Sequence, residues 1–166
     1  RYYLMRNMVL GQDASFSIES FIKRYNSDLA NDYGNLINRV FILIEKYFNK
    51  EIPEHGNYID IDLELIADVK ENTTKILDNY NNLKIHDALE NSIVIFRLVN
   101  KYLEVKKPWK SAKSNSEQKS KTATTLYISA EILRIGSLLL SPVMPTKTKV
   151  VLNDLQCHDF DLTFGI

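Results

Sequence analysis

The apolar residues of this chain recur with the period of an α-helix, and this constrains the fold more than any other feature of the sequence. Between positions 28 and 49 they return every three or four residues, which places them on one side of a helix. Further runs with this period cover residues 17–26, 60–80, 85–107, 122–140 and 146–156. The sequence therefore predicts an all-α domain, a bundle of about five to six helices joined by short connections.

Capping and breaking residues mark the expected helix ends. Ser17, followed by an acidic residue in the first turn, predicts an N-cap. A new helix, capped by Ser27 or Asp28, is expected to start after a break near residues 26–28, and Gly34 should weaken it locally. The fourth long helix should stop before Pro108, because the residue that precedes a proline avoids helical geometry. The segment 111–121, rich in lysine and serine, is expected to be a mobile loop.

Composition excludes several classes of protein. A chain of 166 residues with 45% hydrophobic and 25% charged residues is ordinary for one globular domain. The longest apolar stretches are interrupted by polar residues and glycine and are too short to span a bilayer, so we expect no membrane contact. The one cysteine, Cys157, agrees with a reducing, cytoplasmic setting. The chain opens on Arg1 without an export signal and without an initiator methionine, so we expect a piece of a longer protein.

The net charge is zero, but the charges are unevenly distributed. Residues 101–121 hold seven lysines against two acids, a net charge of +5, and residues 51–79 hold eight acids against two lysines, a net charge of −6. Charge runs of this kind are usually solvated faces, and charge alone favours that interpretation. Attraction of phosphates becomes the better interpretation because Trp109 lies within the basic region.

Three polar residues, Asn31, Asn35 and Arg39, are spaced four apart within one predicted helix. At 3.6 residues per turn this spacing forms a ladder on one face, which suggests a planar polar ligand. Pro108 and Trp109 follow among lysines, and an aromatic ring beside cations is suited to stacking on an unpaired nucleotide base. These features together predict binding of tRNA. Simpler interpretations are an Arg39 ion pair with an acid such as Asp32 and a Trp109 that packs in the bundle.

Short motifs follow one another along the chain in a specific order. They are Arg1-Tyr-Tyr-Leu-Met-Arg6, Gly11-Gln-Asp13, Arg24-Tyr-Asn-Ser-Asp-Leu-Ala-Asn-Asp32, Asn35-Leu-Ile-Asn-Arg39, Asn100-Lys-Tyr-Leu103, Pro108-Trp109, Glu131-Ile-Leu-Arg134 and Leu140-Ser-Pro-Val-Met-Pro145. In this order they resemble the methionyl-tRNA synthetase family. The resemblance implies the helical anticodon-binding domain of a class I synthetase at 17–156. It further implies the end of the catalytic body and a linker at 1–16 and a C-terminal tail at 157–166.

The resemblance also implies roles for residues. The family reads the anticodon CAU; Asn35 and Arg39 match its base-reading pair, Asn31 matches a third polar position, and Trp109 matches the stacking residue. An amide can accept from the cytosine N4 amine while a guanidinium donates to O2 or N3, and uracil offers a carbonyl in place of that amine. Pro108 should fix the approach of its loop. Neighbouring lysines are weaker candidates for phosphate contacts, namely Lys106, Lys110 and Lys113.

The ATP-handling motifs of class I synthetases and the zinc knuckle of the family are missing from this sequence. We therefore expect no catalytic residue, metal or cofactor here, whereas the parent methionine–tRNA ligase would use ATP with magnesium, and zinc in its inserted domain. The expected partners are methionine tRNA and the protein's own catalytic domain. Two alternatives stay open, an anticodon-binding domain of another class I synthetase and a helical module that docks proteins.

Overall fold

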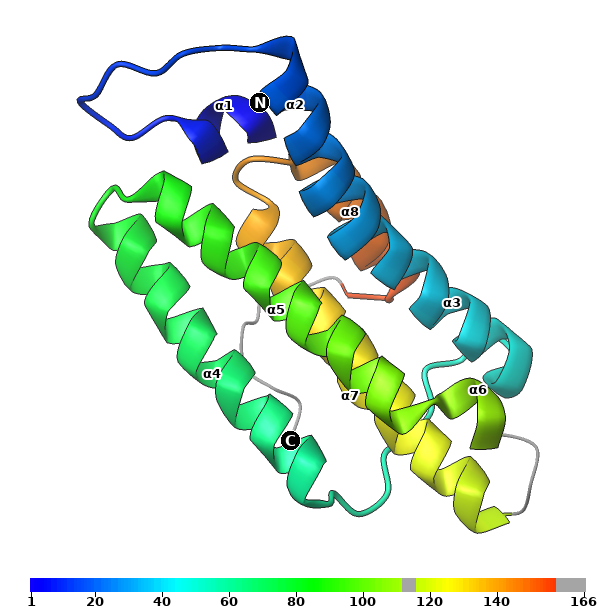
Figure 1. Ribbon diagram of the computed structural model, residues 1–166. Helices are drawn as coiled ribbons and strands as arrows, with labels where there is room; N and C mark the ends of the chain where they lie inside the picture. The colour runs from blue at the N-terminus through cyan, green and yellow to red at the C-terminus, as the bar shows by residue number, and fades with distance from the viewer. Residues whose placement is uncertain (112–115, 158–166) are drawn as a thin grey trace.

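The computed structural model describes residues 1–111 and 116–157, which form a bundle of helices without strands (Figure 1). This confirms the predicted all-α class. The elements in chain order are α1 (Tyr2–Asn7), α2 (Ile18–Arg24), the π-helix η1 (Tyr25–Gly34), α3 (Asn35–Phe48), α4 (Asp60–Asn81), α5 (Ile85–Lys106), α6 (Pro108–Ser111), α7 (Ser116–Leu140) and α8 (Pro145–Asp154).

Helix α7 forms the centre of the bundle. By length and composition alone it could cross a membrane, but 83% of its most apolar stretch is buried inside the bundle. Its contact with α5 is close because it carries a glycine there. A Cβ atom built on Gly136 would lie 2.4 Å from Cε1 of Phe96, a fully buried ring. The absence of a side chain at Gly136 therefore sets how near α5 and α7 approach.

The expected break at residues 26–28 is wrong, because α2, η1 and α3 follow one another without an interruption. The chain widens there into a π-helix, in which hydrogen bonds connect residues five apart rather than four. The two buried residues of η1, Asp28 and Tyr33, are five apart, a spacing that the wider winding keeps on one side of the helix. Asp28 is thus a buried hydrogen-bond acceptor rather than a helix cap. A Cβ on Gly34 would lie 3.0 Å from the carbonyl oxygen of Leu29.

The remaining helix ends follow the predictions with one difference. Ser17 caps α2, because its hydroxyl accepts from the Ser20 amide at 3.0 Å, and α5 ends before Pro108. The expected loop at 111–121 is wrong in its second half, since α7 begins at Ser116. An ion pair between Lys121 and Glu117, one turn apart, supports this added turn. The sequence predicted this helix only from residue 122, because the first turns of α7 are polar and lack the apolar period.

Candidate nucleic-acid interface

The structure brings Arg39 and Trp109 into direct contact. The Arg39 guanidinium carbon on α3 lies 4.8 Å from the ring centroid of Trp109 on α6. A cation at this distance over an indole face is attracted by the ring quadrupole. The Arg39 guanidinium also forms an ion pair with Glu104 of α5. Three helices thus converge on one guanidinium whose side chain is 33% exposed.

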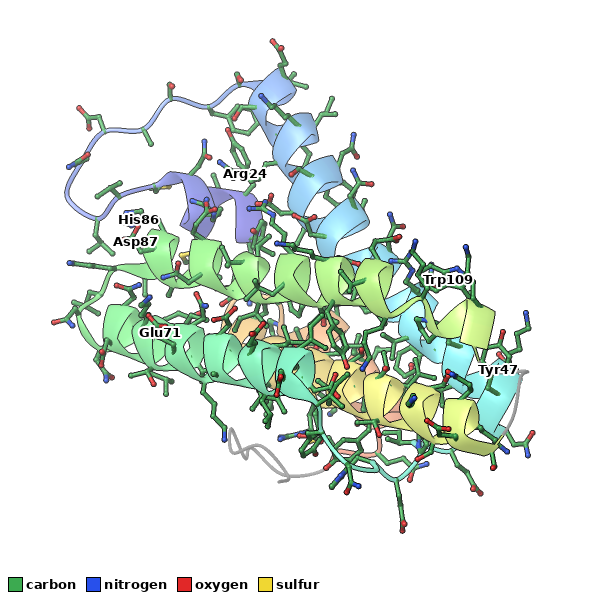
Figure 2. The ribbon with its side chains drawn as sticks, turned by 60° about the horizontal axis from the view of Figure 1, so that its bottom comes forward. Arg24, Tyr47, Glu71, His86, Asp87 and Trp109 are labelled. Atoms are coloured by element: carbon green, nitrogen blue, oxygen red, sulfur yellow. The ribbon has the colours of Figure 1, made fainter. Side chains whose placement is uncertain are left out.

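Backbone geometry at the end of α5 positions Trp109. Lys107 caps α5 in the left-handed region with φ of 45°, and buried Pro108 then opens the single turn α6. The Tyr47 hydroxyl of α3 donates to the Trp109 carbonyl at 3.4 Å. The ring itself is partly buried against the core. Figure 2 shows Trp109 and Tyr47 at one end of the bundle, far from Arg24. Trp109 therefore combines core packing with an accessible, cation-lined ring.

The two asparagines of the predicted ladder are both exposed, but they do not share one helical geometry. Asn35 lies one turn before Arg39 at the start of α3. Asn31 lies in η1, in the π-helical turn that precedes Asn35 on the same continuous helix. Within the described part of the chain neither amide side chain has a hydrogen-bond partner. The structure thus places Asn35 with Arg39 on α3 and Asn31 in the preceding π-helical turn, with both asparagines exposed.

The three lysines proposed for phosphate contacts have different surroundings. Lys106 is tied inward, because its ammonium donates at 2.8 Å to the carboxylate of Asp62, which is 1% exposed. The Tyr102 hydroxyl donates to the same carboxylate at 2.8 Å, and burial raises its pKa, so it remains protonated. Lys110 is exposed beside Trp109. Lys113 lies outside the described residues. Of the two lysines that the structure describes, Lys110 is the one on the surface of this site.

Sequence reasoning missed Glu104 and Tyr47, which hold Arg39 and Trp109 in place. The pairing suggested in the sequence, Arg39 with Asp32, is wrong, because Asp32 pairs with Arg97 at 2.6 Å and Arg39 with Glu104. No local signal pointed to Glu104, because its proximity to Arg39 arises from the packing of α3 beside the end of α5. Glu104 and Trp109 are close in sequence, but that closeness does not predict that Arg39 of α3 lies beside them.

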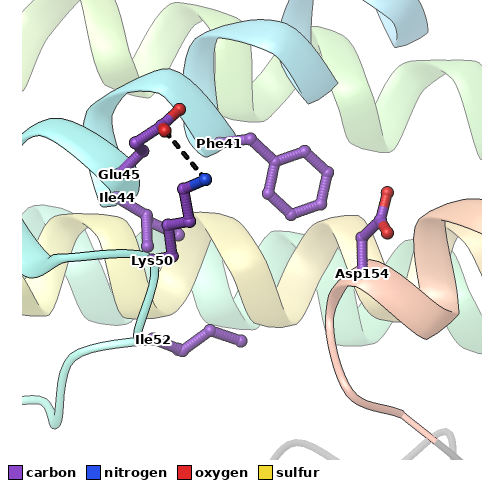
Figure 3. Close-up of a pocket in the computed structure, with 6 residues that line it drawn as sticks. All are labelled: Phe41, Ile44, Glu45, Lys50, Ile52 and Asp154. Carbon is purple, nitrogen blue, oxygen red and sulfur yellow. Dashed lines mark ion pairs between the residues drawn. The ribbon is translucent and has the colours of Figure 1, made fainter.

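Away from this site, the described chain offers metal-capable side chains and surface pockets. Within residues 1–111 and 116–157, no group of three His, Cys, Asp or Glu side chains could hold a metal ion. A pocket of about 320 Å³ opens beside α3 (Figure 3). It is lined by Phe41, Ile44, Glu45, Lys50, Ile52 and Asp154. None of the residues singled out in the sequence contributes to this lining.

Two family profiles match the chain. Residues 1–41 match the class I (M) tRNA synthetases, and residues 52–164 match the anticodon-binding domain of methionyl tRNA ligase. Curated relatives are methionine–tRNA ligases. The one from Mycobacterium tuberculosis strain H37Rv is 36% identical over 154 residues, which cover 92% of this chain and 30% of the relative. The one from Clostridium tetani is 40% identical over 154 residues, with 93% and 24% covered.

Solved structures show the same similarity. The apo form of Mycobacterium tuberculosis methionyl-tRNA synthetase matches with a TM-score of 0.88 and 34% identity, over 92% of this chain and 31% of that one. The same enzyme in complex with methionyl-adenylate matches with a TM-score of 0.87 and 35% identity, over 92% and 30%. The chain thus spans less than a third of the length of these relatives. The chain belongs to the family of anticodon-binding domains of methionyl-tRNA ligase.

Proposed function

We propose that this domain reads the CAU anticodon of methionine tRNA, with Asn35 and Arg39 contacting the cytosine and Trp109 stacking on a base. The observation that carries the proposal is the Arg39 guanidinium 4.8 Å over the Trp109 ring, one helical turn from the exposed Asn35. Together these groups offer a planar donor, an amide and a π-face to one flat ligand. Asn31 takes a supporting role at the rim, and Pro108 fixes the turn that carries the tryptophan.

The wider activity of the parent enzyme is also a proposal. Full-length relatives are methionine–tRNA ligases, and one is solved with methionyl-adenylate. We infer that this chain serves ATP-dependent attachment of methionine to tRNA in the cytoplasm, with the chemistry in a catalytic domain outside this chain. ATP, magnesium and zinc would belong to that domain. We retain the boundaries 1–16, 17–156 and 157–166 for catalytic end, anticodon domain and tail.

An apolar surface supports docking of that catalytic domain. Helix α1, the residue that caps its C-terminus and helix α2 expose large hydrophobic side chains, each between 45% and 69% accessible: Leu4, Met5, Met8, Ile18 and Ile22. Exposed apolar patches of this kind usually mark an interface. These residues fall within the segment matched by the class I (M) tRNA synthetases, residues 1–41. We therefore propose the catalytic domain as the partner that covers them.

The test compares two anticodon stem-loops that differ in one base, CAU and UAU. Arg39→Ala should weaken binding of CAU by about 1–3 kcal/mol, the scale of one good base contact, and UAU by much less. Lys75→Ala on α4, which removes another cation from a surface ion pair, is the matched control and should change neither affinity. Equal losses on both stem-loops would place Arg39 among phosphate contacts and contradict this reading of the site.

A further inference from the structure

A buried carboxylate lies inside the helix that carries the asparagines. Asp28 of η1 is 1% exposed and accepts from three donors on three other elements. The donors are the Tyr2 hydroxyl of α1 at 2.8 Å, Arg24 of α2 at 3.4 Å and Arg97 of α5 at 3.3 Å. A buried carboxylate is costly unless it is paired and hydrogen-bonded, so these donors and the position of Asp28 depend on one another.

Arg97 reaches beyond Asp28 to a second acid of the same π-helix. Its Nε atom donates to Asp32 at 2.6 Å, while its Nη2 atom donates to Asp28. From the next turn of α5, the Asn100 amide donates to the backbone carbonyl of Asp32 at 2.9 Å. Arg97 and Asn100 of α5 thus hold η1 at Asp28 and at Asp32. These two residues lie about one turn apart, before and after Asn31 in the sequence.

The π-winding of this segment decides where the exposed asparagines point. A π-helix is rarely stable by itself and commonly occurs at functional sites, where tertiary contacts hold it. Its wider turn puts Asp28 and Tyr33, five residues apart, on the buried side, while Asn31 faces out. If residues 25–34 returned to α-helical winding, the side chains before Asn35 would rotate about the axis. Asp28 would then leave its donors.

We propose that Arg97 is a positioning residue for anticodon recognition: by bridging Asp28 and Asp32 it holds η1 in its wide winding and so sets the angle at which Asn31 and Asn35 meet the base. The inference rests on the proposed function of this surface. Arginine suits the role because its planar fork donates along two directions at once, which a lysine ammonium does not do from a fixed position. Arg97 need not touch RNA to act in this way.

The experiment uses the full-length ligase that contains this chain, with tRNA carrying CAU or UAU. Arg97→Met keeps the apolar stem and removes the fork. It should raise KM for the CAU tRNA roughly tenfold, the scale of one lost hydrogen bond to a charged group. It should lower the ratio of kcat/KM for the CAU tRNA to kcat/KM for the UAU tRNA, the CAU/UAU ratio. It should leave methionine-dependent ATP–pyrophosphate exchange unchanged. Arg97→Lys should reverse part of the increase in KM but should restore little of the CAU/UAU ratio. Lys75→Ala is the charge-matched control.

Two further measurements keep the inference falsifiable. Asn100→Ala removes the tether to the Asp32 carbonyl and should lower the same ratio, which covers the case in which Arg97→Met does not fold. Amide hydrogen exchange over residues 25–36 should accelerate in both variants. An unchanged CAU/UAU ratio with a lowered melting temperature would reduce Arg97 to a structural role and overturn the inference. So would equal losses on both tRNAs with a flatter salt dependence, which would make Arg97 a phosphate contact. Failure of the unmodified enzyme to discriminate CAU from UAU would instead refute the proposed function.

Discussion

Individual lysines near Trp109 differ in what their charge does. Lys110 is exposed, so its charge is free to attract phosphates, whereas the Lys106 ammonium neutralises the buried carboxylate of Asp62. Lys110→Ala should weaken CAU and UAU stem-loops alike and reduce the slope of log affinity against log salt by about one, as expected for one lost phosphate contact. Binding titrations at several salt concentrations measure this slope. A loss confined to CAU would instead make Lys110 a base contact.

Lys106→Ala is the counterpart at the same end of α5. It should lower the free energy of unfolding by about 1–3 kcal/mol, because it leaves Asp62 with fewer partners in a buried position. Chemical denaturation monitored by circular dichroism measures the loss. Lys106→Met, of similar length and apolar, separates the packing of the stem from the charge. Unchanged stability with a flattened salt slope would return Lys106 to the phosphate-binding surface.

Tyr33 should make the fold sensitive to alkali. Burial raises its pKa from 10.0 to about 12, although a hydrogen bond with Ser137 opposes this shift. Above pH 10 the unfolded chain loses the phenolic proton while the folded chain keeps it, so stability decreases as pH rises from about 10 to about 12. The loss over this interval is roughly 2–3 kcal/mol. Tyr33→Phe should be slightly less stable at neutral pH and should show a shallower decrease above pH 10 in urea unfolding. An equally steep decrease would assign the alkaline sensitivity to other groups.

At the scale of elements, the approach of α5 and α7 depends on the missing side chain at Gly136. In an exposed helix Gly→Ala would stabilise by up to about 1 kcal/mol. Here the added methyl group would collide with the Phe96 ring, so Gly136→Ala should destabilise the domain by about 1–3 kcal/mol. Equilibrium unfolding decides between the two signs. Adding Phe96→Leu should restore part of the loss, because the smaller side chain leaves room for the methyl group.

The long helical segment formed by α2, η1 and α3 connects two parts of the molecule with different surroundings. Its first part contacts α1 through the Asp28 network, and its last part carries Arg39 to the Trp109 turn. Between these two parts, Arg97 and Asn100 of α5 hold η1 through hydrogen bonds to Asp28 and Asp32. These tertiary contacts, rather than helix propensity, account for the π-helical winding.

For the whole molecule, we expect the chemistry and the recognition to be separable. The 166-residue chain, once folded as judged by circular dichroism, should show no methionine-dependent ATP–pyrophosphate exchange. In the full-length ligase, Trp109→Ala should leave that exchange intact and reduce transfer of methionine to tRNA, because a lost stacking plane costs about 1–3 kcal/mol of RNA binding. Exchange activity in the pure chain, or equal damage to both reactions by Trp109→Ala, would contradict this division.

The sequence by itself determined the all-α class, most helix ends and the family, because each depends on local periodicity, capping and motif order. Ser17 caps α2 and Pro108 ends α5 as local rules require. Arg39 and Trp109 could be selected as a pair by their residue types and the family resemblance, but their contact could not be derived from spacing.

Tertiary structure alone decided what depends on long-range partners. Asp28 looks like a cap in sequence, yet Tyr2 and Arg97, both distant along the chain, join Arg24 one turn away to make it a buried acceptor in the widened helix. Lys106 looks like a surface cation until Asp62, far away in sequence, takes its charge. A local pattern records how often a side chain recurs along a helix. It does not record which charge will lie opposite once helices pack, and that pairing separates the inward residues from those left on the surface.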